Sequence, residues 1–178
     1  MRSKLITGAF LLAILPAVMQ AETREDLNTK ASKRDLEVWI GHWSTHGDPG
    51  SWHAESDCSW SREKDFVICD QLINDQQRSL LIINYDSQAG VYKLVSLGTS
   101  RDPAIQTATV LDQVWTVHGT FVENGKSYQI RGMTDFSHPG IYRDVQEHSE
   151  DGGIHWIQDS RGRGQKQEPS TDQHSRCH

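Results

Sequence analysis

Nine histidines are spread along the 178-residue chain, and their spacing is the first test for metal or acid–base chemistry. His42 and His46 are four residues apart, which on a strand places both side chains on one face but roughly 13 Å apart. His148 approaches His155 in one hairpin register and lies opposite Trp156 in a register shifted by one. Solvated strand ends explain these pairs better than a shared metal ion does. We therefore expect no metal site and no cofactor.

Carboxylates and arginines form a second group, in strand-like segments near the C-terminus. If these side chains point into the fold, they form a buried charge network that could bind a carboxylate or move a proton. If they point outward, they form an ordinary solvated face, and this interpretation is favoured. The chain has no Gly-x-Ser-x-Gly motif and no serine–histidine pair that stands out by spacing, so no catalytic residue is assigned. The residues concerned are Asp135, Asp144, Asp159, Arg131, Arg143 and Arg161.

Aromatic side chains are the third group that could recognise a ligand. Trp115, Phe121 and Tyr128 fall on one face of a predicted hairpin, where they could form the apolar walls of a cavity. The same rings could instead fill a small fold solidly, because aromatic side chains bury the most area in a core. Both alternatives stay open, with a slight preference for a cavity.

The elements that must position these residues are short strands. From Gly41 onward, apolar or alternating runs recur every 8–13 residues between turn sequences, which indicates about ten antiparallel strands. The clearest turn is Asn124-Gly125, a dipeptide that tolerates the positive φ angles of a tight hairpin. Closing the sheet into an up-and-down barrel removes exposed strand edges. We predict an all-β antiparallel barrel preceded by a short helix from Ser32 to Ile40; a two-sheet sandwich is the alternative.

The cysteines provide a test of strand register. Cys58 and Cys69 lie on either side of a turn predicted at residues 62–65, in a register that also places Trp60 opposite Val67. Directly opposed residues on neighbouring strands are close enough for a disulfide when the pair is not hydrogen-bonded. We therefore predict a Cys58–Cys69 disulfide and a free Cys177.

The two ends of the chain differ from the middle. Residues 1–21 combine a basic start, a short apolar run and small residues, as in a secretory signal peptide. Residues 22–34 are interpreted as a flexible leader and residues 162–178 as a disordered polar tail. No long apolar run follows, so no integral membrane segment is expected after cleavage. The net charge of −6 makes nucleic acid an improbable partner, because an acidic surface repels phosphates.

Three short motifs occur in a familiar order. Gly41-His42-Trp43 opens the first strand, Ile83-Asn84-Tyr85-Asp86 follows, and Gly90-Val91-Tyr92 begins a later strand. This order resembles the lipocalin-like, or calycin-type, barrels, and more closely an uncharacterised family of exported bacterial proteins. The resemblance covers roughly residues 36–161, and the predicted barrel domain is residues 35–161. It implies that Trp43 closes one end of the barrel and that Arg161, at the end of the last strand, packs across its ring.

Together these observations favour an exported, periplasmic or secreted protein that holds one small, partly apolar molecule inside a barrel. Barrels of this size can just enclose such a ligand. Two other classes stay open. One is an enzyme, for example a lyase, isomerase or hydrolase, that uses an Asp, His and Arg site at the barrel mouth. The other is a structural module of the cell envelope with a solid core.

Overall fold

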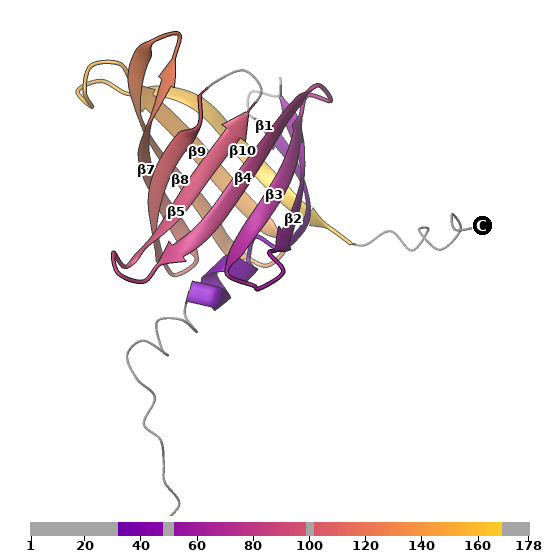
Figure 1. Ribbon diagram of the computed structural model, residues 1–178. Helices are drawn as coiled ribbons and strands as arrows, with labels where there is room; N and C mark the ends of the chain where they lie inside the picture. The colour runs from indigo at the N-terminus through magenta and orange to yellow at the C-terminus, as the bar shows by residue number, and fades with distance from the viewer. Residues whose placement is uncertain (1–31, 48–51, 99–101, 169–178) are drawn as a thin grey trace, which may run out of the picture.

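The computed structural model describes residues 32–47, 52–98 and 102–168, which contain a closed barrel of ten antiparallel strands (Figure 1). Each strand pairs with its neighbours in sequence, and β1 pairs with β10 to complete the wall. The up-and-down barrel is thus confirmed and the sandwich is excluded. The strands are β1 (Gly41–Gly47), β2 (His53–Trp60), β3 (Phe66–Ile73), β4 (Gln77–Asp86), β5 (Val91–Gly98), β6 (Ala104–Leu111), β7 (Val114–Glu123), β8 (Lys126–His138), β9 (Ile141–Ser149) and β10 (Ile157–Gln167).

Tight turns explain why neighbouring strands pair in this register. Asp112 and Gln113 join β6 to β7 with φ angles of 50° and 66°, and Asn124 and Gly125 join β7 to β8 with φ angles of 52° and 76°. Positive φ at both central residues is the turn conformation whose twist matches a two-residue hairpin. Phe121 therefore faces Tyr128, as the sequence predicts.

The predicted disulfide is present. Cys58 of β2 and Cys69 of β3 are directly opposed and bonded, and Trp60 faces Val67 in the same register. Because strand side chains alternate between faces, this pair also fixes which residues of β2 and β3 point into the barrel. Cys58, Cys69 and Val67 belong to the buried core.

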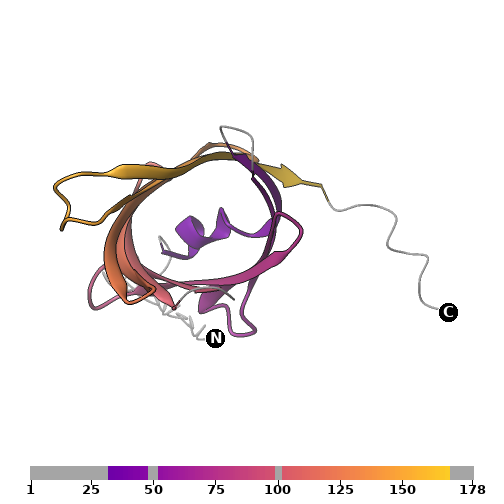
Figure 2. The same cartoon turned by 90° about the horizontal axis from the view of Figure 1, so that it is seen from above.

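A short helix at residues 32–37 closes one end of the barrel, the lower end in Figure 1. Viewed along the barrel axis, it lies across the bore (Figure 2). Leu36 points into the core, and two side-chain hydrogen bonds join the helix to the wall: Tyr92 Oη donates to Asp35 Oδ2 at 2.8 Å, and Trp60 Nε1 donates to Glu37 Oε2 at 2.9 Å. The helix begins at residue 32, so the last three residues of the expected leader are helical, and it ends before Ile40.

The last strand is longer than predicted. β10 continues past Arg161 to Gln167, and its final six residues pair with β1 from Gly162↔Gly47 to Gln167↔His42. The predicted start of a disordered tail at residue 162 is therefore wrong. The polar sequence of this segment shows no strand pattern, because Gly162 and Gly164 carry no side chains of their own. The rings of Trp52 and Tyr142 cover these two glycines instead.

Several predictions concern residues outside those that the structure describes. These are the signal peptide at residues 1–21, most of the leader, the free Cys177 and the remainder of the C-terminal tail. In the described ranges, no helical segment has the length and apolar character that crossing a bilayer requires.

Candidate functional site

The half of the barrel bore next to the helix is filled by aromatic rings. Trp115 is fully buried, and its ring centre is 5.4 Å from that of Trp39 and 4.5 Å from that of Tyr92. Trp43 packs against Phe136 at 5.8 Å and donates its indole N–H to the Trp39 carbonyl at 2.8 Å. We call this the closed half; the Cys58–Cys69 disulfide belongs to the same core cluster.

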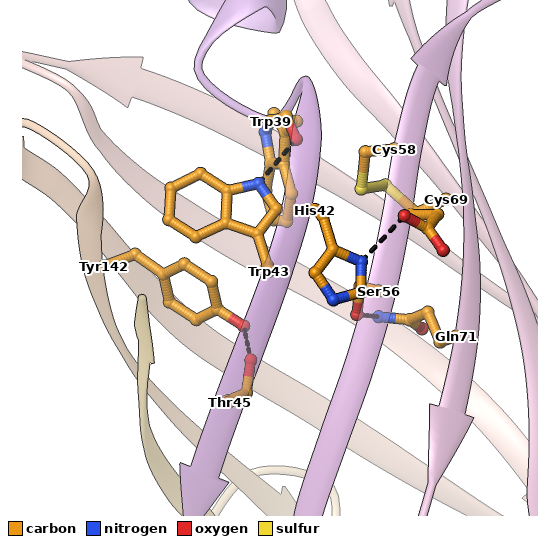
Figure 3. Close-up of a disulfide and its surroundings, with 10 residues drawn as sticks. Trp39, His42, Trp43, Thr45, Ser56, Cys58, Cys69, Gln71 and Tyr142 are labelled. Carbon is orange, nitrogen blue, oxygen red and sulfur yellow. Dashed lines mark hydrogen bonds and ion pairs between the residues drawn. A yellow bond between two sulfur atoms is a disulfide. The ribbon is translucent and has the colours of Figure 1, made fainter. Parts of the chain in front are cut away.

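The half of the bore away from the helix is hollow. A cavity of about 590 Å³ lies above Trp39, within the size range of small-molecule sites. We call this the open half. Its walls mix apolar side chains with neutral polar ones, of which Ser56, Gln71, Ser79, Ser96, Gln106 and Gln146 are examples. One polar pair is internally satisfied, because Gln71 Nε2 donates to Ser56 Oγ at 3.3 Å (Figure 3).

Asp144 of β9 is the buried carboxyl group of this cavity. Its residue is 9% exposed, and its Oδ1 atom is buried without a hydrogen-bond partner among the described residues. Burial raises the pKa of Asp144 to about 6, because desolvation disfavours the charged form. The sequence-based preference for an outward, solvated Asp144 is therefore wrong. The period-two pattern could not show which face of β9 is inside, since both faces carry polar residues.

Trp52 and Gly162 complete the surroundings of this carboxyl group. A Cβ atom on Gly162 would lie 2.5 Å from Asp144 Oδ1 and 3.1 Å from the nearest Trp52 ring carbons. The Trp52 ring also covers Gly47, where an added Cβ would lie 1.9 Å from the indole nitrogen. The missing side chains of Gly47 and Gly162 thus leave the space in which Trp52 packs beside Asp144.

Tyr142 separates Asp144 from the closed half. Its ring covers Gly164 and packs against Trp43 with ring centres 5.2 Å apart. Its hydroxyl shares a hydrogen bond of 2.5 Å with Thr45 Oγ1 (Figure 3). Burial raises the pKa of Tyr142 to about 12, so the phenol stays neutral at physiological pH.

A histidine–carboxylate pair lies farther along β9. His148 Nδ1 is hydrogen-bonded to Asp159 Oδ1, both side chains line the cavity, and the Tyr128 ring meets the His148 ring edge-on at 5.5 Å. Asp144 and His148 are four residues apart on one strand face, which separates them by about 13 Å. Neither of the two registers considered for this hairpin occurs, because β10 pairs Ile157 with His148 and His155 instead bonds Asp151.

The three residues predicted to contact a ligand divide between the two halves. Phe121 and Tyr128 line the cavity and stack on each other, with centres 4.8 Å apart and planes 9° apart. Trp115 lies in the closed half and belongs to the packed core. The hairpin register places all three on the inner face, but only the helix position decides which part of that face is filled.

The barrel closes at Trp43 as expected, but the basic residue over its ring is a different one. Trp43 is 3% exposed at the closed end, and β1 pairs with β10 as expected. The cation over its ring is Lys166, with Nζ 5.7 Å from the ring centre. Arg161 is exposed and pairs with Val145, five positions away along β10. The underestimated length of β10 is the cause of the misassignment.

Trp52, Ser56 and Gln71 are among the cavity residues that sequence reasoning missed. Ser56 and Gln71 could have been found, because each lies two positions from a disulfide cysteine and so shares its inward face. Trp52 precedes β2, and its ring extends over Gly47 of β1 to Gly162 of β10, a contact that no local pattern indicates.

No group of three or more His, Cys, Asp or Glu side chains is placed to hold a metal ion in the described ranges. Neither a family model nor a curated protein matches this chain. The closed ten-strand antiparallel barrel is compatible with a calycin-like fold.

Proposed function

We propose that this protein is exported and binds one small, partly apolar molecule in the open half of its barrel. A single observation carries the proposal: a cavity of about 590 Å³ with polar walls lies directly above a tightly packed aromatic core. Protein interiors normally pack without such voids. Buried polar groups cost stability unless they are hydrogen-bonded, so a purely structural barrel gains nothing from placing them there.

Two further features support this proposal. The disulfide between Cys58 and Cys69 suits an oxidising compartment outside the cytoplasm, in agreement with the signal-like residues 1–21. The Phe121–Tyr128 pair offers apolar surface beside polar groups that can orient a ligand. Membership of the lipocalin-like family named above is part of this proposal.

The test begins with protein purified from the exported fraction without denaturation. Native mass spectrometry should detect a bound small molecule, and the environment-sensitive dye N-phenyl-1-naphthylamine should bind once that molecule is removed. Ser96→Phe should abolish dye binding because Ser96 lines the cavity. Thr109→Phe is the matched control, since Thr109 is exposed on β6. An empty protein whose dye affinity is equal in both variants would contradict the proposal.

One observation favours a second candidate function, acid–base catalysis at the cavity. His148 and Asp159 are bonded side by side on the cavity wall, and a carboxylate that holds an imidazole is a common acid–base arrangement. The experiment is to incubate the co-purified molecule with wild-type protein and with His148→Ala, and to follow its mass. Conversion by the wild type alone supports catalysis, whereas an unchanged mass in both samples leaves binding as the function.

A further inference from the structure

The open half contains a negative group that the fold itself does not use. Asp144 Oδ1 is buried and makes no hydrogen bond within the described part of the chain. Across β8 and β10 it faces Thr134 and Gly162, neither of which brings a positive charge. Along β9 its inward neighbour Tyr142 has its hydroxyl committed to Thr45. A buried carboxylate oxygen without a partner is unfavourable, and a ligand that donates a hydrogen bond to it would remove that penalty.

The charges on the cavity wall indicate which kind of donor fits. Its acidic residues are Glu123, Asp144 and Asp159, and its basic ones are Arg131 and His148. Arg131 is already paired with Glu147 and lies 4.1 Å from the Trp156 ring centre, and His148 is bonded to Asp159. Neither of these two basic side chains is thus available to Asp144. The wall therefore favours a positively charged ligand group and disfavours an anion.

An aromatic ring stands beside the same carboxyl group. Trp52 and Asp144 both border the empty side-chain position of Gly162, at 3.1 Å and 2.5 Å from an added Cβ. A carboxylate next to an indole is a pairing that recognises organic cations, since the first provides charge-assisted hydrogen bonds and the second a cation–π contact. Elsewhere on the wall of the same cavity, the apolar side chains Leu94, Val117 and Phe121 can receive an apolar frame attached to that cation.

We infer that the cavity takes an organic cation, an ammonium or amidinium group on a small aromatic or apolar frame, with the cationic group hydrogen-bonded to Asp144 and lying against Trp52. This inference rests on the proposed function, whose ligand class it specifies. The raised pKa of Asp144 agrees with it, because a carboxyl group prepared for a cation is poorly solvated before the cation arrives.

The test uses three probes that share one phenyl frame: 2-phenylethylamine, 2-phenylethanol and 3-phenylpropionate. Isothermal titration calorimetry is performed at pH 8 on the ligand-free protein, where Asp144 is ionised. We expect the amine to bind at least tenfold more tightly than the alcohol, and the carboxylate to bind most weakly. Asp144→Asn should weaken amine binding at least tenfold and leave alcohol binding within twofold.

Asp70→Asn provides the charge-matched control. It also removes one negative charge, but Asp70 is exposed on the outer face of β3. It should leave amine binding unchanged. Thermal unfolding of each variant verifies that it is folded. Equal affinities for amine and alcohol, or an amine affinity that survives Asp144→Asn, would overturn the inference while leaving a small-molecule site intact. Failure of all three probes overturns the inference as well, whereas the proposed function fails only if the dye and native mass spectrometry experiments also find no ligand.

Discussion

The two halves of the barrel bore are built by the same ten strands but from different inward-facing side chains. In the closed half, Trp43, Trp115 and Phe136 pack against the helix and leave almost no exposed surface. In the open half, the same strands carry serine, threonine and glutamine inward around a cavity of about 590 Å³. Most strands thus contribute one end to the core and the other end to the cavity wall.

This difference indicates how stability and binding are distributed. Burial of large aromatic side chains supplies the largest favourable term in a small domain. The closed half concentrates that term together with the disulfide and the two hydrogen bonds of the helix. The open half can then contain groups that are unfavourable for folding, such as Asp144, because the closed half offsets their cost. Substitutions in the closed half should therefore act mainly on stability, whereas those in the open half should act on ligand binding as well.

The largest effect is expected from Trp115→Ala. Truncating this fully buried ring should lower the free energy of unfolding by about 3–5 kcal/mol, since it removes buried area and leaves a cavity. Phe121→Ala, in the open half, should cost about 1 kcal/mol because its ring is only partly buried. Denaturant unfolding monitored by circular dichroism compares the two. Equal losses would show that the halves do not differ in their contribution to stability.

The second effect is an increase in stability, produced by Asp144→Asn. The pKa of Asp144 is about 6 in the folded protein and 3.8 for the free group. The folded state therefore binds this proton more tightly than the unfolded state, and the wild type becomes less stable as pH rises from about 4 to about 6. Asp144→Asn cannot ionise and should be more stable than the wild type above pH 6, by up to about 3 kcal/mol. Below pH 4 the two should be alike. Urea unfolding at pH 4 and pH 8 measures this difference, and a variant less stable at pH 8 would contradict a desolvated carboxyl group.

The third effect tests the disulfide of the closed half. Replacing both Cys58 and Cys69 by Ala should lower the free energy of unfolding by about 2–3 kcal/mol, because the unfolded chain regains the freedom of a short closed loop. Reducing agent should destabilise the wild type but not the double variant. Dye affinity should be unchanged where the protein is folded, since neither cysteine lines the cavity. A large loss of dye binding by folded protein would mean that the two halves are coupled.

The fourth effect concerns the space beside Asp144. Gly162→Ala places a Cβ 2.5 Å from Asp144 Oδ1 and 3.1 Å from the Trp52 ring, so both must shift, at a cost of about 1–2 kcal/mol. Dye binding should weaken, and tryptophan emission should change as Trp52 moves. Gly98→Ala is the control for close packing, because Gly98 also lines the cavity but an added Cβ there has nothing within 4 Å. Identical behaviour of the two alanine variants would argue against the close packing described for Gly162.

The smallest effect is at the outer edge of the closed end. Lys166→Gln removes the cation that lies 5.7 Å from the Trp43 ring centre and should cost about 0.5 kcal/mol, the usual value for an exposed contact. Arg161→Gln should cost less, because Arg161 is exposed and distant from Trp43 along β10. Thermal unfolding at low salt is the measurement that compares the stability of the two variants. A larger loss from Arg161→Gln would restore the original sequence-based assignment.

Local features of the chain determined much of the fold. The Asn124-Gly125 turn sets the register of β7 and β8, and the opposed Cys58 and Cys69 set that of β2 and β3. These predictions succeeded because a turn and a period-two pattern involve residues close in sequence, whose geometry is decided by backbone sterics. The same reasoning identified Phe121 and Tyr128 as neighbours on an inward face.

Only the tertiary structure decided how the barrel closes and where it is hollow. Gly162 and Gly164 carry no side chain, so no sequence pattern marks the part of β10 beyond Arg161 as a strand; the rings of Trp52 and Tyr142, distant in sequence, cover them. The inward position of Asp144 depends likewise on β8 and β10 pairing on either side of it. Such contacts join segments far apart in the chain, and their free energy depends on how shapes fit after the barrel has closed, which residue types and spacing do not encode.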